Sequence, residues 1–363
     1  MSKRITPLAA VGVVAALALP AAASATTKVV GMGPAAKDSK ALNALAKNHN
    51  ADFIDVNSFF PRGTTIHVGD RVRFLPHGFH TVDLPARGGS KTPLFTPTGA
   101  AESQSDAAGQ PFWWNGLPVL SFNPTLLSGG FGKSLAYTGA KAVNTGLPLG
   151  KAKPMTVKFT RAGSYTYFCD VHPGMTGTVT VRPKAKSTPS ARADRKALRR
   201  TVAADLKTAK RLVKTKPASN TVSVGAAGRG GVEYFQMFPR RLTVPAGTTV
   251  KFRMSKASRE VHTATFGSDP NSSSSYLNPI LAGFEGRAPT LDGRGVYPSD
   301  VPGTLASMSS ALHGNGFWNS GVMDAARATK QIPSSGTLRF GTPGTYQYYC
   351  LIHSNMHGTI IVK

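Results

Sequence analysis

Alternation of apolar and polar residues predicts short β-strands along most of the chain. Runs of β-branched and aromatic residues lie at positions 53–56, 66–68, 72–74, 163–168 and 178–181. Such runs between turns that contain Gly and Pro are typical of half-buried strands. Residues 38–48, rich in Ala, Leu and Lys, predict a helix. The 38 Gly and 26 Pro residues, with only 17% charged residues, also indicate a loop-rich, all-β protein.

The second half of the chain repeats the first. The tripeptide Phe60-Pro61-Arg62 recurs 178 positions later as Phe238-Pro239-Arg240, and Gly69 recurs as Gly247. A repeat of this length indicates an internal duplication. We therefore expect two domains, at residues 26–183 and 218–363, each long enough for its own core.

Residues 184–217 form a basic linker between the two predicted domains. One apolar stripe at helical spacing predicts a helix here; its members are Leu198, Val202, Leu206, Ala209 and Val213. The stripe could pack on a neighbouring domain, or the basic helix could lie on an anionic envelope surface. We favour packing, because runs of charge are commonly solvated faces.

The first 25 residues predict export. They combine Lys3 and Arg4, an apolar run at 8–19 and the triplet Ala23-Ser24-Ala25, as in a secretory signal peptide. No later segment is long and apolar enough to predict a transmembrane helix. We expect a periplasmic, cell-envelope or extracellular protein. Its net charge of +26 indicates an anionic partner, and export argues against nucleic acid.

Candidate metal ligands gather at the end of the strand-like run 163–168. Cys169, His172 and Met175 lie within seven residues, and His80 precedes the long central segment. Two imidazoles and a thiolate with a weak axial thioether are the ligands of a blue-copper electron-transfer site. The same set recurs in the second half as His262, Cys350, His353 and Met356. The only two cysteines fall in these motifs, so we expect two thiolates and no disulfide.

An upstream His-Thr followed by Cys-x-x-His-x-x-Met before a final strand resembles the cupredoxins, the plastocyanin, pseudoazurin and amicyanin family. The resemblance implies two Greek-key β-sandwiches, each with one type 1 copper that cycles between Cu(I) and Cu(II). It also implies that His80 and His262 are interior ligands and that His172 and His353 stand at the solvent edge. Redox protein partners, acidic ones in view of the basic charge, would exchange electrons there. Thr81 and Thr263 are expected to hydrogen-bond to the Cys loops.

Other functions compete with electron transfer. Multicopper oxidases and copper nitrite reductases are also built from cupredoxin repeats. They need additional copper ligands, commonly supplied by His-x-His pairs, and this sequence contains no His-x-His pair. We therefore do not expect an enzyme. Copper storage or delivery stays open, as does zinc at the same ligands.

Two long Gly-, Pro- and Ser-rich segments separate the upstream histidines from the cysteines, 89 positions in the first half and 88 in the second. Segments of this length are commonly functional or poorly ordered. They carry the aromatic runs 112–114 and 317–318. These rings could fasten the segments to the sandwich as a satellite cluster or bind a partner, and we favour the first.

Overall fold

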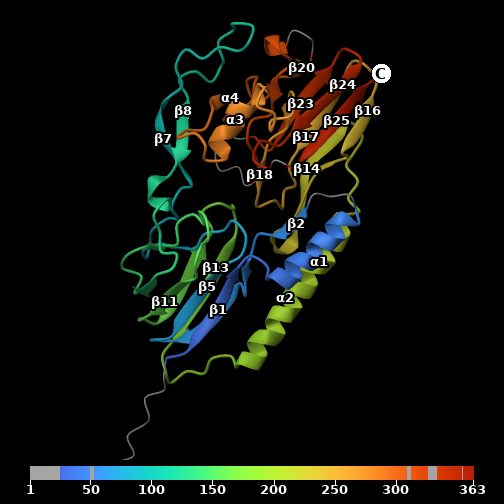
Figure 1. Ribbon diagram of the computed structural model, residues 1–363. Coiled ribbons are helices and arrows are strands. Elements are labelled where there is room, and N and C mark those ends of the chain that lie inside the picture. Colours follow the sequence, from blue (N-terminus) through green and yellow to red (C-terminus); the bar gives the residue numbers. More distant parts are fainter. Residues whose placement is uncertain (1–24, 50–52, 309–311, 326–332, 354) are drawn as a thin grey trace, which may run out of the picture.

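The structure, a computed structural model, describes residues 25–49, 53–308, 312–325, 333–353 and 355–363 (Figure 1). It consists of two β-sandwiches with a few helices, and the predicted all-β class is confirmed. The predicted signal peptide, apart from Ala25, lies outside the described residues.

The first sandwich has two five-stranded sheets, in the orders β3-β1-β5-β11-β9 and β10-β6-β12-β13-β4. Its core is a single cluster of aliphatic and aromatic side chains from both sheets. Inward residues alternate with outward ones along strands such as β13, as the sequence pattern predicts. The strands are β1 (Thr27–Met32), β3 (Phe59–Phe60), β4 (Gly63–His67), β5 (Arg71–Pro76), β6 (Asp83–Leu84), β9 (Ser134–Tyr137), β10 (Val143–Asn144), β11 (Met155–Phe159), β12 (Gly163–Phe168) and β13 (Thr176–Arg182).

The second sandwich repeats this arrangement, with sheets β2-β15-β14-β17-β23-β20 and β16-β25-β24-β19-β21. A short pair, β18 (Val261–His262) and β22 (Met323–Asp324), lies beside them. The sheet strands are β14 (Thr221–Gly228), β15 (Val232–Phe238), β16 (Arg241–Val244), β17 (Thr248–Arg253), β19 (Thr265–Phe266), β20 (Ala306–Met308), β21 (Trp318–Asn319), β23 (Ser335–Phe340), β24 (Gly344–Tyr349) and β25 (His357–Val362).

Strand β2 (Phe53–Val56) joins the two repeats. It lies in the first half of the chain but pairs antiparallel with β15 of the second sandwich, with Phe53 opposite Phe235 and Val56 opposite Val232. At the repeat offset of 178, β2 and the start of β15 are equivalent segments. The two repeats therefore meet through their equivalent strands, as in a two-fold symmetric pairing.

Two helices cover the joined strands on one side (Figure 1). They are α1 (Ala36–Lys47) and α2 (Ala191–Leu212). The hydroxyl of Ser190 caps α2 by accepting a hydrogen bond from the backbone N–H of Ala193 at 3.2 Å. The stripe predicted from Leu198 to Val213 packs against α1, β2, β14 and β15, so the packing alternative is confirmed. Within the described residues, no helix combines the length and apolar character that a bilayer crossing requires.

In the second half, Phe317 and Trp318 pack within their own half, as expected. The part of the first long segment that carries the aromatic run 112–114 does not pack on the first sandwich. Its hairpin, β7 (Phe95–Ala100) and β8 (Pro118–Phe122), extends along the second sandwich beside α3 (Leu277–Phe284) and α4 (Gly293–Val296) (Figure 1). Trp114 packs with Tyr297 there, and the indole N–H of Trp113 donates to the carbonyl of Pro298 at 2.8 Å. These rings hold the hairpin against the second half of the chain, because that half offers an apolar surface there. Short 3₁₀ turns lie at Pro124–Leu126, Arg229–Gly231 and Leu312–Gly314.

Candidate metal centre

The first cluster brings together three of the predicted ligands from two separate turns. His80 follows β5, and Cys169 and His172 follow β12. Nδ1 of His80 lies 2.9 Å from Nδ1 of His172, and Sγ of Cys169 lies 3.4 Å from the latter atom. All three side chains are buried. The three ligand atoms thus converge on one point inside the sandwich.

Met175 closes the same turn. The backbone N–H of Cys169 donates to the carbonyl of Met175 at 3.0 Å, and the N–H of Met175 donates to the carbonyl of His172 at 3.1 Å. The Met175 side chain is fully buried in the core cluster that contains Cys169. The seven-residue spacing therefore folds into one compact loop between β12 and β13.

The second cluster has the same construction. Nδ1 of His262 lies 3.0 Å from Nδ1 of His353, and Sγ of Cys350 lies 3.8 and 3.6 Å from these two atoms. Met356 is fully buried in the core cluster of Cys350, and its carbonyl accepts from the Cys350 N–H at 2.8 Å. Both cysteines are free thiols, as expected.

The threonines after the interior histidines support the cysteine loops, as expected. The Thr81 hydroxyl accepts from the N–H of Asp170 at 2.7 Å, and the Thr263 hydroxyl accepts from the N–H of Leu351 at 2.9 Å. The backbone N–H groups of Thr81 and Thr263 each lie 3.4 Å from the neighbouring sulfur. Such outer contacts hold ligands in place before a metal arrives.

Two glycines that the sequence reasoning missed make room for the interior imidazoles. Gly33 has φ +104° and Gly225 has φ +75°. A Cβ on Gly33 would lie 3.0 Å from Nε2 of His80, and one on Gly225 would lie 2.8 Å from Nε2 of His262. Glycine is required at both positions by backbone conformation and by space. The signal was a Gly upstream of each copy of the Phe-Pro motif, Gly33 directly after β1 and Gly225 within β14.

The charges within the clusters favour thiolates. Burial alone would raise the pKa of Cys169, but His172 and His80 outweigh it and hold the pKa well below its ordinary value. Hydrogen bonds from His262 and His353 likewise outweigh burial and lower the pKa of Cys350. Burial would lower the pKa of His353, yet Cys350 and Glu260 raise it to about 10. A thiolate is the form of cysteine that binds metals.

The donor set fits copper. Each cluster supplies two imidazole nitrogens and one sulfur, and these atoms lie within 4.8 Å of one another. Imidazole and thiolate together suit copper, and zinc accepts the same donors. In the described part of the chain, these are the two groups of three or more such side chains close enough to share an ion.

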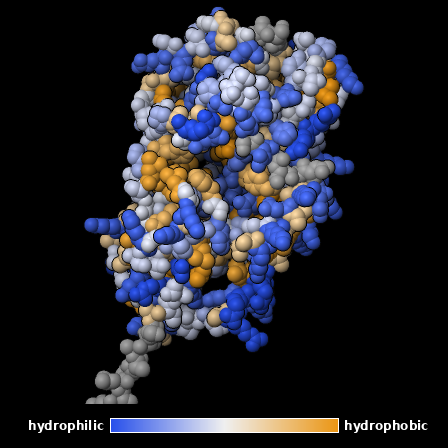
Figure 2. All heavy atoms as spheres, viewed as in Figure 1, coloured by the Kyte–Doolittle hydropathy of each residue, from blue (hydrophilic) through white to orange (hydrophobic). Residues whose placement is uncertain are grey.

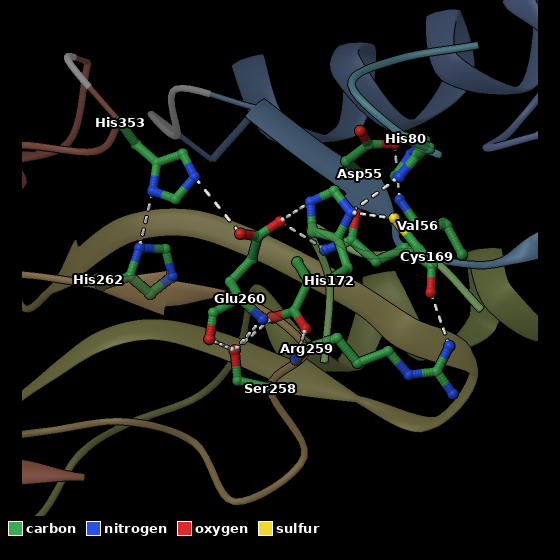
Figure 3. A network of polar contacts seen from close by, with 12 residues as sticks. Asp55, Val56, His80, Cys169, His172, Ser258, Arg259, Glu260, His262 and His353 are labelled. Atoms are coloured by element: carbon green, nitrogen blue, oxygen red, sulfur yellow. Dashed lines mark hydrogen bonds and ion pairs between the residues drawn. The ribbon is translucent and has the colours of Figure 1, made fainter. Parts of the chain in front are cut away.

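The expected solvent-edge position is wrong for His172, whereas the side chain of His353 is 17% exposed. His172 is only 6% exposed, and its Nε2 faces Glu260 of the second half at 3.0 Å. Nε2 of His353 faces the same carboxylate at 3.5 Å (Figure 3). The pairing of β2 with β15 brings the two halves together, and Glu260 of the second half covers the edge of His172.

A cavity of about 330 Å³ lies in front of these histidines. Besides His80, His172, His353 and Glu260, its walls are mainly apolar side chains from both halves of the chain, including Phe53, Phe79, Phe95, Phe122, Phe235 and Phe284. Figure 2 shows hydrophobic residues on both sides of the hollow between the halves. The histidine edges thus lie next to an apolar space between the sandwiches rather than on an open surface.

Residues 107–182 match the family of copper binding proteins described as the plastocyanin/azurin family. The matched segment contains Cys169, His172 and Met175. Over this segment the match agrees with the sequence resemblance to the cupredoxins. No curated protein matches the chain.

Several solved structures resemble part of the chain. A purple cupredoxin from Nitrosopumilus maritimus is 16% identical, with a TM-score of 0.19, over 39% of this chain and 98% of its own. A mutant plastocyanin of fern is 23% identical, with a TM-score of 0.21, over 39% and 99%. The Cu(I) form of the M51A mutant of amicyanin is 16% identical, with a TM-score of 0.21, over 42% and 89%.

Proposed function

We propose that the protein is an exported electron carrier with one type 1 copper in each sandwich. The ligands are His80, Cys169, His172 and Met175 in the first site. In the second they are His262, Cys350, His353 and Met356. The observation that carries the proposal is the convergence of two Nδ1 atoms and one thiolate sulfur in both buried clusters. Copper at these ligands would supply a one-electron couple, Cu(I)/Cu(II).

The surrounding chain supports such a couple by holding the ligands rigidly. The interior histidines are packed against backbone at glycines, and the cysteine turns are closed by backbone hydrogen bonds. Burial of both thiolates excludes water and exogenous ligands from the sulfur. A frame that cannot rearrange suits a metal whose two oxidation states must share one geometry.

We further propose that the external partner is an acidic redox protein that docks near Phe79. This ring is next to His80, lines the cavity and is 50% exposed. A small apolar contact suits a transient redox encounter. The net charge of +26 would attract an acidic partner and raise the encounter rate at low salt. The exposed basic side of α2 could in addition bind an anionic envelope surface.

Copper storage or delivery is the second candidate. One observation bears on it: all six His and Cys donor side chains lie in the sandwich interior, and five are buried, with His353 partly so. Copper exchange with a delivery partner needs ligands that the partner can reach. We therefore favour electron transfer, and we propose that the protein is not an enzyme.

The proposal is tested by copper titration of the exported protein. We expect two coppers per chain and strong visible absorption from thiolate-to-copper charge transfer in the oxidised form. Cys169→Ser and Cys350→Ser should each bind one copper and keep the spectrum of the remaining site, because the clusters lie in separate cores.

The double variant should lose the visible absorption entirely. Leu127→Ser, a change at an exposed position outside both clusters, serves as the control and should bind two coppers. A wild-type protein that holds fewer than two coppers, or whose copper lacks charge-transfer absorption, would contradict the proposal.

A further inference from the structure

The carboxylate of Glu260 lies between the two metal centres. Its Oε1 is 3.0 Å from Nε2 of His172, and its Oε2 is 3.5 Å from Nε2 of His353 (Figure 3). Each histidine directs Nδ1 to its own cluster and Nε2 to this carboxylate. One side chain thus contacts a candidate ligand of each centre.

Glu260 is buried and held in place from both halves of the chain. Its side chain is 6% exposed. The amide of Asn57, which follows β2, donates to Oε1 at 2.6 Å. The backbone N–H of Glu260 donates to the Ser258 hydroxyl at 3.1 Å. A buried carboxylate is costly unless hydrogen bonds satisfy it, and here the donors come from both sandwiches.

The two repeats differ at this position. Glu260 lies two residues before His262, whereas the residue two positions before His80 is Gly78. Gly78 has φ +74°, and a Cβ there would lie 3.2 Å from Nε2 of His80. Two carboxylates facing each other between the halves would repel, whereas one carboxylate can accept hydrogen bonds from both histidines. The duplication has therefore become asymmetric where the two halves meet.

We propose that Glu260 couples the two metal centres into one unit and carries electron exchange between them within the chain. This inference rests on the proposed function. The path runs across the ring of His172 from Nδ1 to Nε2, over the carboxylate, and across the ring of His353. With copper held at both centres, one electron would pass between them, so that Cu(I) would become Cu(II) at one centre and Cu(II) would become Cu(I) at the other. No bond forms or breaks, and no proton changes place.

Glu260→Gln tests the coupling. Glutamine has the same shape, but its amide nitrogen cannot accept a hydrogen bond, so at most one of the two histidine contacts survives. In protein loaded with two coppers and reduced by one electron in a pulse, we expect internal exchange to slow at least tenfold. The single-site variants Cys169→Ser and Cys350→Ser supply the reference spectra of the two centres.

A second measurement is independent of electron transfer. In the diamagnetic Cu(I) protein, the Nε2 protons of His172 and His353 should give two proton resonances that exchange slowly with water, because both protons face the buried carboxylate of Glu260. Glu260→Gln should lose at least one of them. The control is Asp106→Asn, in the loop of the β7–β8 hairpin, whose carboxylate is 7% exposed and accepts from the N–H groups of Ala108 and Gln110 at 2.9 Å. It should keep both resonances and the exchange rate.

Asn57→Ala provides a variant that leaves the carboxylate itself unchanged and should slow exchange less than Glu260→Gln does. The inference is overturned if Glu260→Gln binds two coppers, exchanges within twofold of wild type and keeps both Nε2 proton resonances. If Glu260→Gln does not fold, an Asn57→Ala protein with the wild-type rate and resonances overturns it. Failure of wild type to bind two coppers would instead overturn the proposed function.

Discussion

At the scale of single residues, Asp70 shows how one carboxylate fastens a strand. Its Oδ1 accepts from the N–H of Thr26 at 2.7 Å, and its Oδ2 accepts from the N–H of His67 at 2.9 Å. Asp70 thereby holds the chain before β1 against the turn between β4 and β5. Burial alone would raise the pKa of Asp70, but these backbone hydrogen bonds outweigh it and lower the pKa below 3.8.

We predict that Asp70→Asn destabilises the protein by about 1–3 kcal/mol at pH 7, since one charged acceptor is replaced by a donor. The folded pKa is lower than the unfolded one, so the contribution of Asp70 is present above about pH 4 and is lost as the pH falls through the folded pKa. The difference between variant and wild type should therefore shrink at pH 3. Urea unfolding at both pH values measures it. Glu102→Gln, at an exposed position, is the control. An equal loss of stability in Asp70→Asn at both pH values would refute the electrostatic explanation.

At the scale of elements, the β7–β8 hairpin holds the two halves together through a few aromatic contacts. Trp114 is fully buried, stacks on Phe112 at a centroid distance of 4.6 Å and packs on Tyr297 at 5.9 Å. Gly293 passes so close that a Cβ there would lie 2.5 Å from the indole ring. The hairpin is therefore fitted to this one surface of the second half.

We predict that Trp114→Ala releases the hairpin, because deletion of a buried indole typically costs about 3–5 kcal/mol. Hydrogen exchange should rise at residues 95–122, and limited proteolysis should cut there first. Leu149→Ala, at an exposed position, should leave both measurements unchanged. Wild-type protection of the hairpin in Trp114→Ala would contradict this prediction and would show that the backbone contacts of the strands hold the hairpin in place without the indole.

The elements also show what the sequence could predict. Local patterns identified the strands, the apolar stripe of α2 and the cysteine turns, because each depends on neighbouring residues. The partner of β2 was not predictable, since its alternation is the same whether it joins its own sheet or that of the other repeat. In the sequence Glu260 is a charged residue between Arg259 and Val261, and no local pattern relates it to His172. Only the meeting of the two halves gives it contact with both histidines.

At the scale of the whole molecule, the two sandwiches are joined by more than the linker. Strand β2 completes a sheet of the second sandwich, the hairpin covers α3 and α4, and α1 and α2 pack over the shared strands. The pairing of Arg62 with Asp205, whose oxygens lie 3.1 Å from Nη2, adds a contact between the first sandwich and α2. Domains with separate cores usually move independently when their interface is small. Here a shared sheet crosses the boundary.

We therefore predict that the metal-free protein unfolds in one cooperative transition. Val157→Ala in the first core and Val250→Ala in the second each remove two buried methyl groups and should destabilise by about 1–3 kcal/mol. If the halves unfold together, either variant lowers the urea midpoint of both sandwiches by the same amount. Hydrogen exchange at increasing urea, followed in β12–β13 and in β24–β25, reads the two sandwiches separately. Val301→Ala, at an exposed position, is the control. If the halves unfold independently, only the urea midpoint of the sandwich that carries the substitution will fall. That result would also remove the basis for a fixed contact between Glu260 and both histidines.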